Sequence, residues 1–302
     1  MDFLNRMIKV IDYLESHLAD RLDLQDLSNI ICCNPYQFGR IFSYVTGIPL
    51  AEYVRKRRLS LAAAELAHGT SKVLDTAYKY GYSSPEAFAR AFKEMHGISP
   101  REAAVFGAEL KMYPRLAFQI TIKGVESMEY KIVERDVIRG VGVTRKFGRF
   151  EPNRQLDDWK DQMGEVWLFW EEFLNEGANL ILRDKYKLYR EPFWQMGVSS
   201  TDSEGSLTVS IGAEDSGGNY PELTRFEIPA STWAVFSTQG SLNGGSHPVD
   251  ALLTKIFSEW LPSSGYEQSM NYQIEVYGPG DTGRDDYQIE LWIPVRLKQR
   301  RL

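Results

Sequence analysis

The first hundred residues repeat apolar side chains at the period of an α-helix. Between Phe3 and Leu18 the apolar positions are spaced three and four residues apart, which places them on one helix face. Several shorter segments continue this period. Breaks rich in glycine, proline, asparagine or aspartate separate them at residues 20–23, 34–35, 47–49, 69–71, 81–85 and 97–100. The pattern predicts an all-helical region.

After about residue 107 the pattern changes to the two-residue alternation of β-strands. It begins with Phe118, Ile120 and Ile122 and continues from Tyr130 to Val141. Helical spacing returns twice, and each helix is followed by two strand-like runs. The helices are expected at 159–177 and 248–260, and the other strands at 194–200, 207–211, 225–238, 272–277 and 287–295. This order predicts an α+β domain of two strand-helix-strand-strand repeats.

Two helix-turn-helix patterns lie about fifty residues apart within the helical region. Asn34 and Ser84 are suited to cap the second helix of each pattern, and a proline follows each of them at the first helical position. Phenylalanines of both helices are expected to face inward. The side chains left outward, where such a helix meets base edges, are Tyr36, Gln37 and Arg40 in the first pattern and Glu86, Arg90 and Lys93 in the second. We expect these six to face DNA.

The run from residue 35 to 66 and the run from 81 to 100 resemble the DNA-binding domain of the AraC/XylS transcription regulators. The family's alternation of Phe, Arg and Phe occurs at residues 38–42 and 88–92, and its Arg-Leu pair occurs at Arg58-Leu59. The resemblance covers about residues 5–105 and implies that the two recognition helices enter successive major grooves. It departs at Gly39, where members often carry a polar side chain, and after Pro100, where the usual Tyr-Arg pair is missing.

A basic run, Arg55 to Arg58, lies on the helix between the two patterns. Its side chains could contact DNA phosphates or form a solvated helix face, and we take Arg58 as the candidate for DNA contact.

The second half of the chain combines large aromatic side chains with acidic strand positions. All seven tryptophans follow residue 113, and Glu275 and Glu290 each lie inside a strand pattern. A carboxylate that faces an aromatic-lined cavity attracts a cation, and the rings add cation-π attraction. The pattern therefore indicates a pocket for a positively charged molecule, although each aromatic could equally be plain core and Glu290 the solvent face of an edge strand.

Residues 127–298 resemble the GyrI-like effector-binding domain, which also occurs in multidrug-sensing regulators. The motifs are residues 226–240, Glu259 to Tyr266, Glu275-Val276-Tyr277 and Glu290 to Val295. By this resemblance the domain binds amphipathic, often cationic molecules, and the glutamate of the Glu-x-Tyr strand opposes the charge. Glu275 is then the first candidate and Glu290 the second, and the candidate pocket walls are Trp167, Trp170, Trp194, Trp233, Tyr272 and Trp292.

The two predicted domains differ in net charge. The net charge is -6, but residues 1–112 carry 14 basic and 13 acidic side chains, whereas the remainder carries 21 and 28. The acidic total therefore does not exclude DNA binding, because only the docking face acts there. We expect a DNA-binding domain at 1–108, a linker at 109–126 and an effector domain at 127–302.

Several classes of protein are not expected. The two cysteines are adjacent, which disfavours a disulfide, and the four histidines show no metal-ligand spacing. No apolar run approaches the roughly 18 residues of a membrane span and no leader pattern is present, so we expect a cytoplasmic protein without metal or cofactor.

The resulting hypothesis is a ligand-responsive transcription regulator that is not an enzyme. Its expected partners are double-stranded promoter DNA and a small-molecule effector, with RNA polymerase as a further candidate. Two alternatives remain: a constitutive DNA-binding regulator whose second domain contacts a protein, and a small-molecule hydrolase in which Glu275 orients water.

Overall fold

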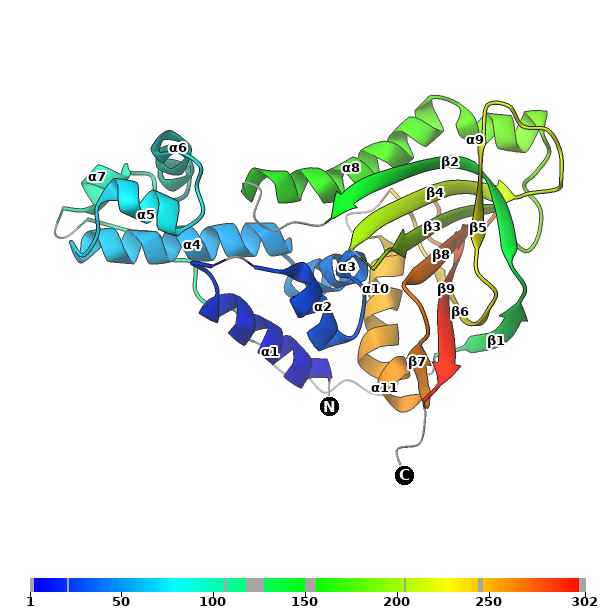
Figure 1. Ribbon diagram of the computed structural model, residues 1–302, viewed down its shortest axis with the longest axis horizontal. Helices are drawn as coiled ribbons and strands as arrows, with labels where there is room; N and C mark the ends of the chain where they lie inside the picture. Colours follow the sequence, from blue (N-terminus) through cyan, green and yellow to red (C-terminus); the bar gives the residue numbers. More distant parts are fainter. Residues whose placement is uncertain are drawn as a thin grey trace.

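A helical region and a curved β-sheet domain make up the protein (Figure 1). The computed structural model describes residues 3–20, 22–105, 108–117, 128–149, 156–203, 205–243 and 247–298. The helices of the first region are α1 (Phe3–Ser16), α2 (Leu24–Ile31), α3 (Pro35–Thr46), α4 (Leu50–Ala67), α5 (Val73–Lys79), α6 (Pro85–His96) and α7 (Pro100–Ala103). The two helix-turn-helix units, α2–α3 and α5–α6, lie near opposite ends of α4 (Figure 1).

The capping residues fix where both recognition helices begin. The Asn34 side chain accepts a 2.8 Å hydrogen bond from the backbone N–H of Gln37, whose side chain accepts one back from the Asn34 N–H at 3.2 Å. Ser84 accepts from the N–H of Ala87 at 3.1 Å. These bonds satisfy donors that a helix start otherwise leaves unpaired, so the predicted starts of α3 and α6 are confirmed.

Each unit has its own apolar interior, and α4 contributes to both. Phe38 and Phe42 of α3 are fully buried, as are Phe88 and Phe92 of α6, which pack around Leu59 and its apolar neighbours on α4. The predicted inward faces are therefore confirmed. The helix between the units begins at Leu50, so the basic run Arg55 to Arg58 lies in its interior.

The chain returns along α4 before it enters the sheet domain. The N–H of Tyr113 donates to the Ser60 hydroxyl at 2.9 Å, and its carbonyl accepts from Arg57 at 2.6 Å. Residues 108–117 form neither a helix nor a strand. The alternation at Phe118, Ile120 and Ile122 lies outside the described residues.

The strands of the described residues form one antiparallel sheet in the order β1-β6-β9-β8-β3-β4-β2-β5, with β7 paired to β9. Their bounds are β1 (Tyr130–Arg135), β2 (Ile138–Arg149), β3 (Gln195–Thr201), β4 (Ser206–Glu214), β5 (Thr224–Ile228), β6 (Ser231–Gln239), β7 (Tyr266–Gln268), β8 (Tyr272–Tyr277) and β9 (Gln288–Leu297). The connecting helices are α8 (Leu156–Asn175), α9 (Ala178–Leu180), the π-helix η1 (Ile181–Lys185), α10 (Pro248–Lys255), the π-helix η2 (Ile256–Trp260) and α11 (Leu261–Ser263). None of the helices in the described ranges is both long and apolar enough to span a membrane.

The strand order confirms the predicted internal repeat. The units β2-α8-β3-β4 and β6-α10-β8-β9 each place their first strand outermost, their third strand next and their second strand innermost. The two innermost strands, β3 and β8, pair at the centre, with Gly197 opposite Glu275. The protein is thus an all-α double helix-turn-helix region followed by an α+β domain of two repeats, as predicted. The short strand β7 was not predicted.

Side chains of β8 alternate between the two faces of the sheet. Ile274 and Val276 belong to an apolar cluster with Trp233 and Trp292. Tyr277 belongs to the core that the sheet forms with its helices. Because successive strand residues point to opposite faces, Glu275 shares the helix-covered face with Tyr277.

Candidate effector site and DNA-reading helices

The face of α3 that was predicted to read DNA is buried against the sheet domain. The exposed fractions of Tyr36, Gln37 and Arg40 are 9%, 0% and 9%. Helix α3 contacts α10, and Figure 1 shows it at the end of the sheet next to α10. These three side chains point away from their own domain's core, as predicted, but they meet the other domain rather than an open surface.

Arg40 joins the two domains through two carboxylates. Its Nε donates to Oδ1 of Asp250 on α10 at 2.6 Å, and its Nη1 donates to Oε1 of Glu275 on β8. The guanidinium also lies 5.7 Å from the ring centre of Tyr36, within cation-π range. Arg40 therefore holds the position in which a positively charged ligand of Glu275 would lie.

Polar neighbours complete the shell around Glu275. The hydroxyl of Tyr277 donates to Oε2 at 2.6 Å, and the amide of Gln273 donates to Oε1 at 2.8 Å. Gln273 in turn accepts a 3.1 Å hydrogen bond from the amide of Gln37 on α3. The carboxylate is thus paired and hydrogen-bonded, which buried charges require.

The two charges stabilise each other's ionised form. Burial opposes ionisation of Glu275, but Arg40, His247 and the Tyr277 hydroxyl outweigh it and hold its pKa below the usual value. Burial also opposes the charge on Arg40, yet Glu275, Tyr36 and Asp250 raise its pKa well above normal. Burial lowers the pKa of His247, although Glu275 and Asp250 act in the opposite direction.

A cleft of about 1630 Å³ opens around this ion pair. Its walls come from both domains, with α3 and α4 on one side and α8, α10, β3 and β8 on the other. Five carboxylates line it (Glu52, Glu94, Glu171, Asp250 and Glu275), against three guanidinium groups (Arg40, Arg55 and Arg183). Carboxylates therefore outnumber guanidinium groups in the lining, although Arg55 pairs with Glu52 and Glu94.

Three of the six predicted aromatic walls line the cleft. Trp170 lies edge-on to Tyr277 with ring centres 5.3 Å apart, Trp167 lies 5.8 Å from His247, and Trp194 adds a third ring. Trp170 covers Gly197 so closely that a Cβ there would fall 2.4 Å from its ring. A glycine at this position of β3 is what allows the ring to lie on the strand beside Glu275.

The other three predicted walls do not line the cleft. Trp233, Trp292 and Tyr272 belong to the apolar cluster on the opposite face of the sheet, where the rings of Trp233 and Trp292 lie 6.4 Å apart. In the sheet Trp292 pairs with Ile274, whose side chain faces away from the cleft. Trp233 and Trp292 are core residues, and Tyr272 packs against them half-buried.

Glu290 lies outside the cleft as well. In the sheet register it pairs with Val276, which faces away from the helices. Its carboxylate accepts from the indole of Trp292 at 3.0 Å and from Lys131 at 3.4 Å. The prediction of Glu290 as a second ligand for the effector charge is wrong in this structure, since the sheet separates it from Glu275.

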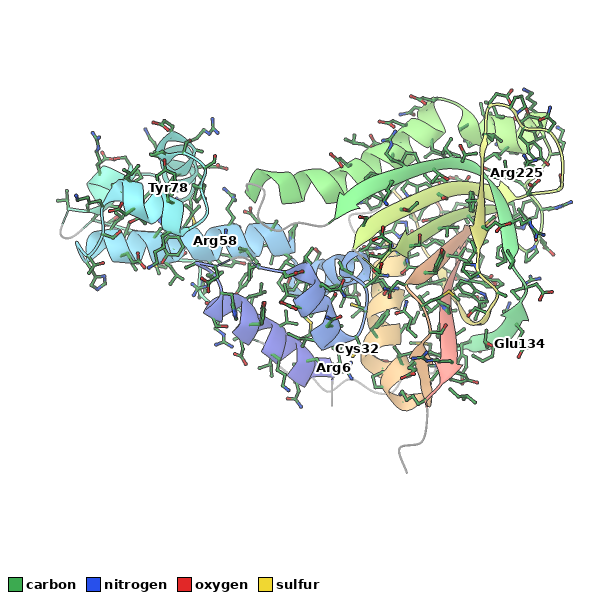
Figure 2. The ribbon with its side chains drawn as sticks, viewed as in Figure 1. Arg6, Cys32, Arg58, Tyr78, Glu134 and Arg225 are labelled. Atoms are coloured by element: carbon green, nitrogen blue, oxygen red, sulfur yellow. The ribbon has the colours of Figure 1, made fainter. Side chains whose placement is uncertain are left out.

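The second recognition helix, α6, presents its predicted face openly. Glu86, Arg90 and Lys93 are exposed. Arg58, in contrast, is only 4% exposed and projects from the middle of α4 (Figure 2). It donates to the carbonyls of Asp20 at 3.1 Å and Tyr80 at 3.4 Å, so its guanidinium joins the end of α5 to the segment between α1 and α2 and is not on the surface as predicted for DNA contact.

Several residues around Glu275 were not identified from the sequence. Gln273 and Tyr277 could have been, because each lies two positions from Glu275 and therefore on the same strand face. Asp250 and His247 gave no such signal. Asp250 has the ordinary appearance of an acidic residue in the first turn of a helix.

Comparisons with known proteins agree with both halves of the fold. A family model described as a helix-turn-helix domain matches residues 27–104, and one described as integron-associated effector binding protein matches residues 131–295. The matches fall within the two expected domains, whose boundaries remain a prediction.

Three relatives illustrate the similarity. The HTH-type transcriptional activator AarP of Providencia stuartii is 37% identical over 92 residues, 30% of this chain and 68% of AarP. The HTH-type transcriptional regulator YbfP of Bacillus subtilis is 38% identical over 92 residues, 30% of this chain and only 31% of its own length. The right origin-binding protein of Escherichia coli is 24% identical over 294 residues, 94% of this chain and 96% of that protein.

Two helix-turn-helix units joined to a two-repeat domain with a cleft define a DNA-binding regulator with an effector-binding domain. The chain belongs to the AraC/XylS family of transcription regulators, with an AraC-type helix-turn-helix domain at its N-terminal side and a GyrI-like effector-binding domain, of the integron-associated type, at its C-terminal side.

Proposed function

We propose that this transcription regulator responds to a cationic, aromatic or amphipathic molecule that binds in the cleft with its charge against Glu275. The observation that carries the proposal is a buried carboxylate beside Trp170 that already pairs with a cation, the guanidinium of Arg40. Such a site favours positive charge by Coulomb attraction in a partly desolvated environment and by cation-π attraction to the rings.

The remaining lining supports the same class of ligand. The carboxylates of the cleft outnumber its guanidinium groups even with Arg40 in place, and Trp167 and Trp194 add flat apolar surface. Pockets for small molecules typically combine such apolar walls with a few polar groups that set orientation. The relatives are transcription regulators, and both oxygens of Glu275 are engaged by donors, which disfavours the hydrolase alternative.

Binding of tetraphenylphosphonium to the full chain tests the proposal. Calorimetry and quenching of tryptophan fluorescence should both show saturable binding. Glu275→Gln should weaken it at least about tenfold, because loss of one buried charge contact costs more than about 1.4 kcal/mol. Glu290→Gln is the matched control, since this carboxylate pairs with Val276 on the face of the sheet away from the cleft. The affinity of this variant for the cation should equal that of the wild type.

The absence of saturable binding by this cation and by rhodamine would contradict the proposed ligand class. Equal affinities for the wild type and Glu275→Gln would contradict the assigned carboxylate and leave the ligand class standing.

A further inference from the structure

The first recognition helix cannot reach DNA in the arrangement that the structure shows. A recognition helix reads bases with the side chains of its outer face, and on α3 those side chains are Tyr36, Gln37 and Arg40, each at most 9% exposed. The same face of α6 is exposed. One of the two DNA-reading helices is therefore covered by the effector domain, while the other remains accessible.

Arg40, which covers the carboxylate of Glu275, is itself one of the residues expected to read DNA. Arg40 is the cation that pairs with Glu275, and Asp250 binds the same guanidinium from α10. Gln37, the neighbouring reading residue, bonds to Gln273 of β8. The effector domain thus binds two side chains of α3. Arg40 occupies the place expected for a cationic ligand, and the amide of Gln37 makes a hydrogen bond of the kind it would make to a base edge.

We propose that this contact is autoinhibitory: Arg40 acts as an internal cation at Glu275, and a cationic effector releases α3 for DNA by taking its place. The inference rests on the proposed function and specifies how that site is regulated. Release requires no covalent step, only exchange of one cation for another at the same carboxylate.

The chemistry of the contact makes such an exchange feasible. A buried ion pair gains attraction but loses the hydration of both charges, so its net contribution to stability is small. Arg40 regains hydration or a DNA partner when it leaves, and the effector cation takes over the pairing with Glu275. The contact between α3 and α10 is therefore suited to reversible opening rather than to permanent assembly.

When α3 is released, the protein can bind DNA with two recognition helices, because α6 is already accessible. Two linked binding units engage DNA much more tightly than one, because the second binds at high effective concentration. The effector and the DNA both favour the open state, so each must tighten the binding of the other by the same factor.

Variants of the carboxylates that hold Arg40 test the inference independently of the ligand. Asp250→Asn removes one of these charges from α10 without changing the recognition helix. With a duplex selected from a random pool by the wild-type full chain, it should bind about tenfold more tightly in the absence of effector, since closure no longer reduces the competent fraction. Glu275→Gln should do the same. Glu227→Gln, an exposed carboxylate of β5 paired with Arg139, is the control and should bind DNA like the wild type.

Saturating tetraphenylphosphonium should also tighten duplex binding by the wild type about tenfold. The same cation should change duplex binding by Asp250→Asn little, because this variant is already open. Arg40→Met provides a second measurement on the full chain: it removes the internal competitor and should tighten tetraphenylphosphonium binding several-fold. Arg90→Met, the matched position on α6, should leave that affinity unchanged because its side chain is exposed and does not line the cleft.

The possible results separate the two proposals. If tetraphenylphosphonium binds and Glu275→Gln weakens it, but neither the cation nor Asp250→Asn changes duplex affinity, autoinhibition is overturned and the effector site stands. If no cation binds, but Asp250→Asn and Glu275→Gln both bind the duplex more tightly than the wild type, the results support autoinhibition and contradict the proposed ligand class. Weaker duplex binding by a folded Asp250→Asn protein, judged by its circular dichroism and its melting temperature, would overturn the inference outright.

Discussion

The guanidinium of Arg40, on the first recognition helix, donates to the carboxylate of Glu275, which lies 235 positions further along the chain on the central strand of the effector domain. One contact therefore connects the residue expected to read DNA with the residue expected to bind the effector.

The two recognition helices should differ in when they contribute to DNA affinity. Arg90→Ala, on the exposed helix α6, should weaken binding to the selected duplex by about 1–3 kcal/mol with and without tetraphenylphosphonium. Arg40→Ala should cost a similar amount only at saturating cation, because without it Arg40 is engaged by Glu275. Fluorescence anisotropy measures both. An equal cost of Arg40→Ala under the two conditions would contradict this difference.

Gly81 should be more sensitive to substitution than the glycines that end α3 and α6. All three have a left-handed backbone, with φ of +82°, +69° and +83° for Gly81, Gly47 and Gly97, so alanine costs about 1–2 kcal/mol at each. Only at Gly81 would the new Cβ meet another group, Nη1 of Arg58 at 2.7 Å. Urea unfolding should therefore show the largest loss for Gly81→Ala, with Gly47→Ala and Gly97→Ala as controls. Equal losses at all three would indicate that Arg58 yields without cost.

The ion pair between Glu15 and Arg57 should make the stability of the helical region depend on pH. Burial opposes ionisation of Glu15, but hydrogen bonds from Arg57 and Tyr53 outweigh it and lower its pKa below 4.5. A carboxyl with a lowered pKa in the folded state stabilises the fold above its unfolded pKa, and this stabilisation is lost as the pH falls through the folded value.

Glu15→Gln should therefore lower the free energy of unfolding at pH 7 by about 1–3 kcal/mol. Urea unfolding curves of the variant and the wild type should converge as the pH falls below 4.5. Asp12→Asn is the control, because its ion pair with Arg115 is about half exposed on both sides and contributes little. A difference between Glu15→Gln and the wild type that stays constant with pH would contradict the assignment.

Gly197 and Trp170 should be energetically coupled. Gly197→Ala places a Cβ where the Trp170 ring lies, so the ring must move into the cleft and tetraphenylphosphonium affinity should fall at least several-fold. Trp170→Ala removes the ring that a Cβ at position 197 would meet, and it also removes one wall of the cleft. Adding Gly197→Ala to Trp170→Ala should then change stability much less than Gly197→Ala alone, which thermal unfolding of the four proteins measures. Additive losses would show that the two residues do not touch in solution.

Local signals in the sequence determined most elements of both domains. The caps Asn34 and Ser84 with their prolines fixed the starts of α3 and α6, and apolar periodicity identified the inward phenylalanines, because these preferences act within a few residues of the chain. The strand Tyr272–Tyr277 was also predicted with its bounds, and with it the position of Glu275.

Sheet pairing decided which candidates share the cleft. Glu290 and Trp292 alternate along their own strand in a way that is compatible with either face. Only the register that opposes Ile274 to Trp292 and Val276 to Glu290 places both away from Glu275. A shift of one residue would reverse every side chain, and register depends on partners that are distant in sequence.

The docking of the recognition helix was beyond sequence reasoning altogether. By itself the sequence was enough to predict that Arg40 leaves its own domain's core and that Glu275 pairs with a positive charge, since each prediction depends on local periodicity and on the charge of one side chain. Only the tertiary structure decided that the two groups meet. Their contact depends on the balance between desolvation and Coulomb attraction across an interface between domains, and no local pattern in the chain encodes that balance.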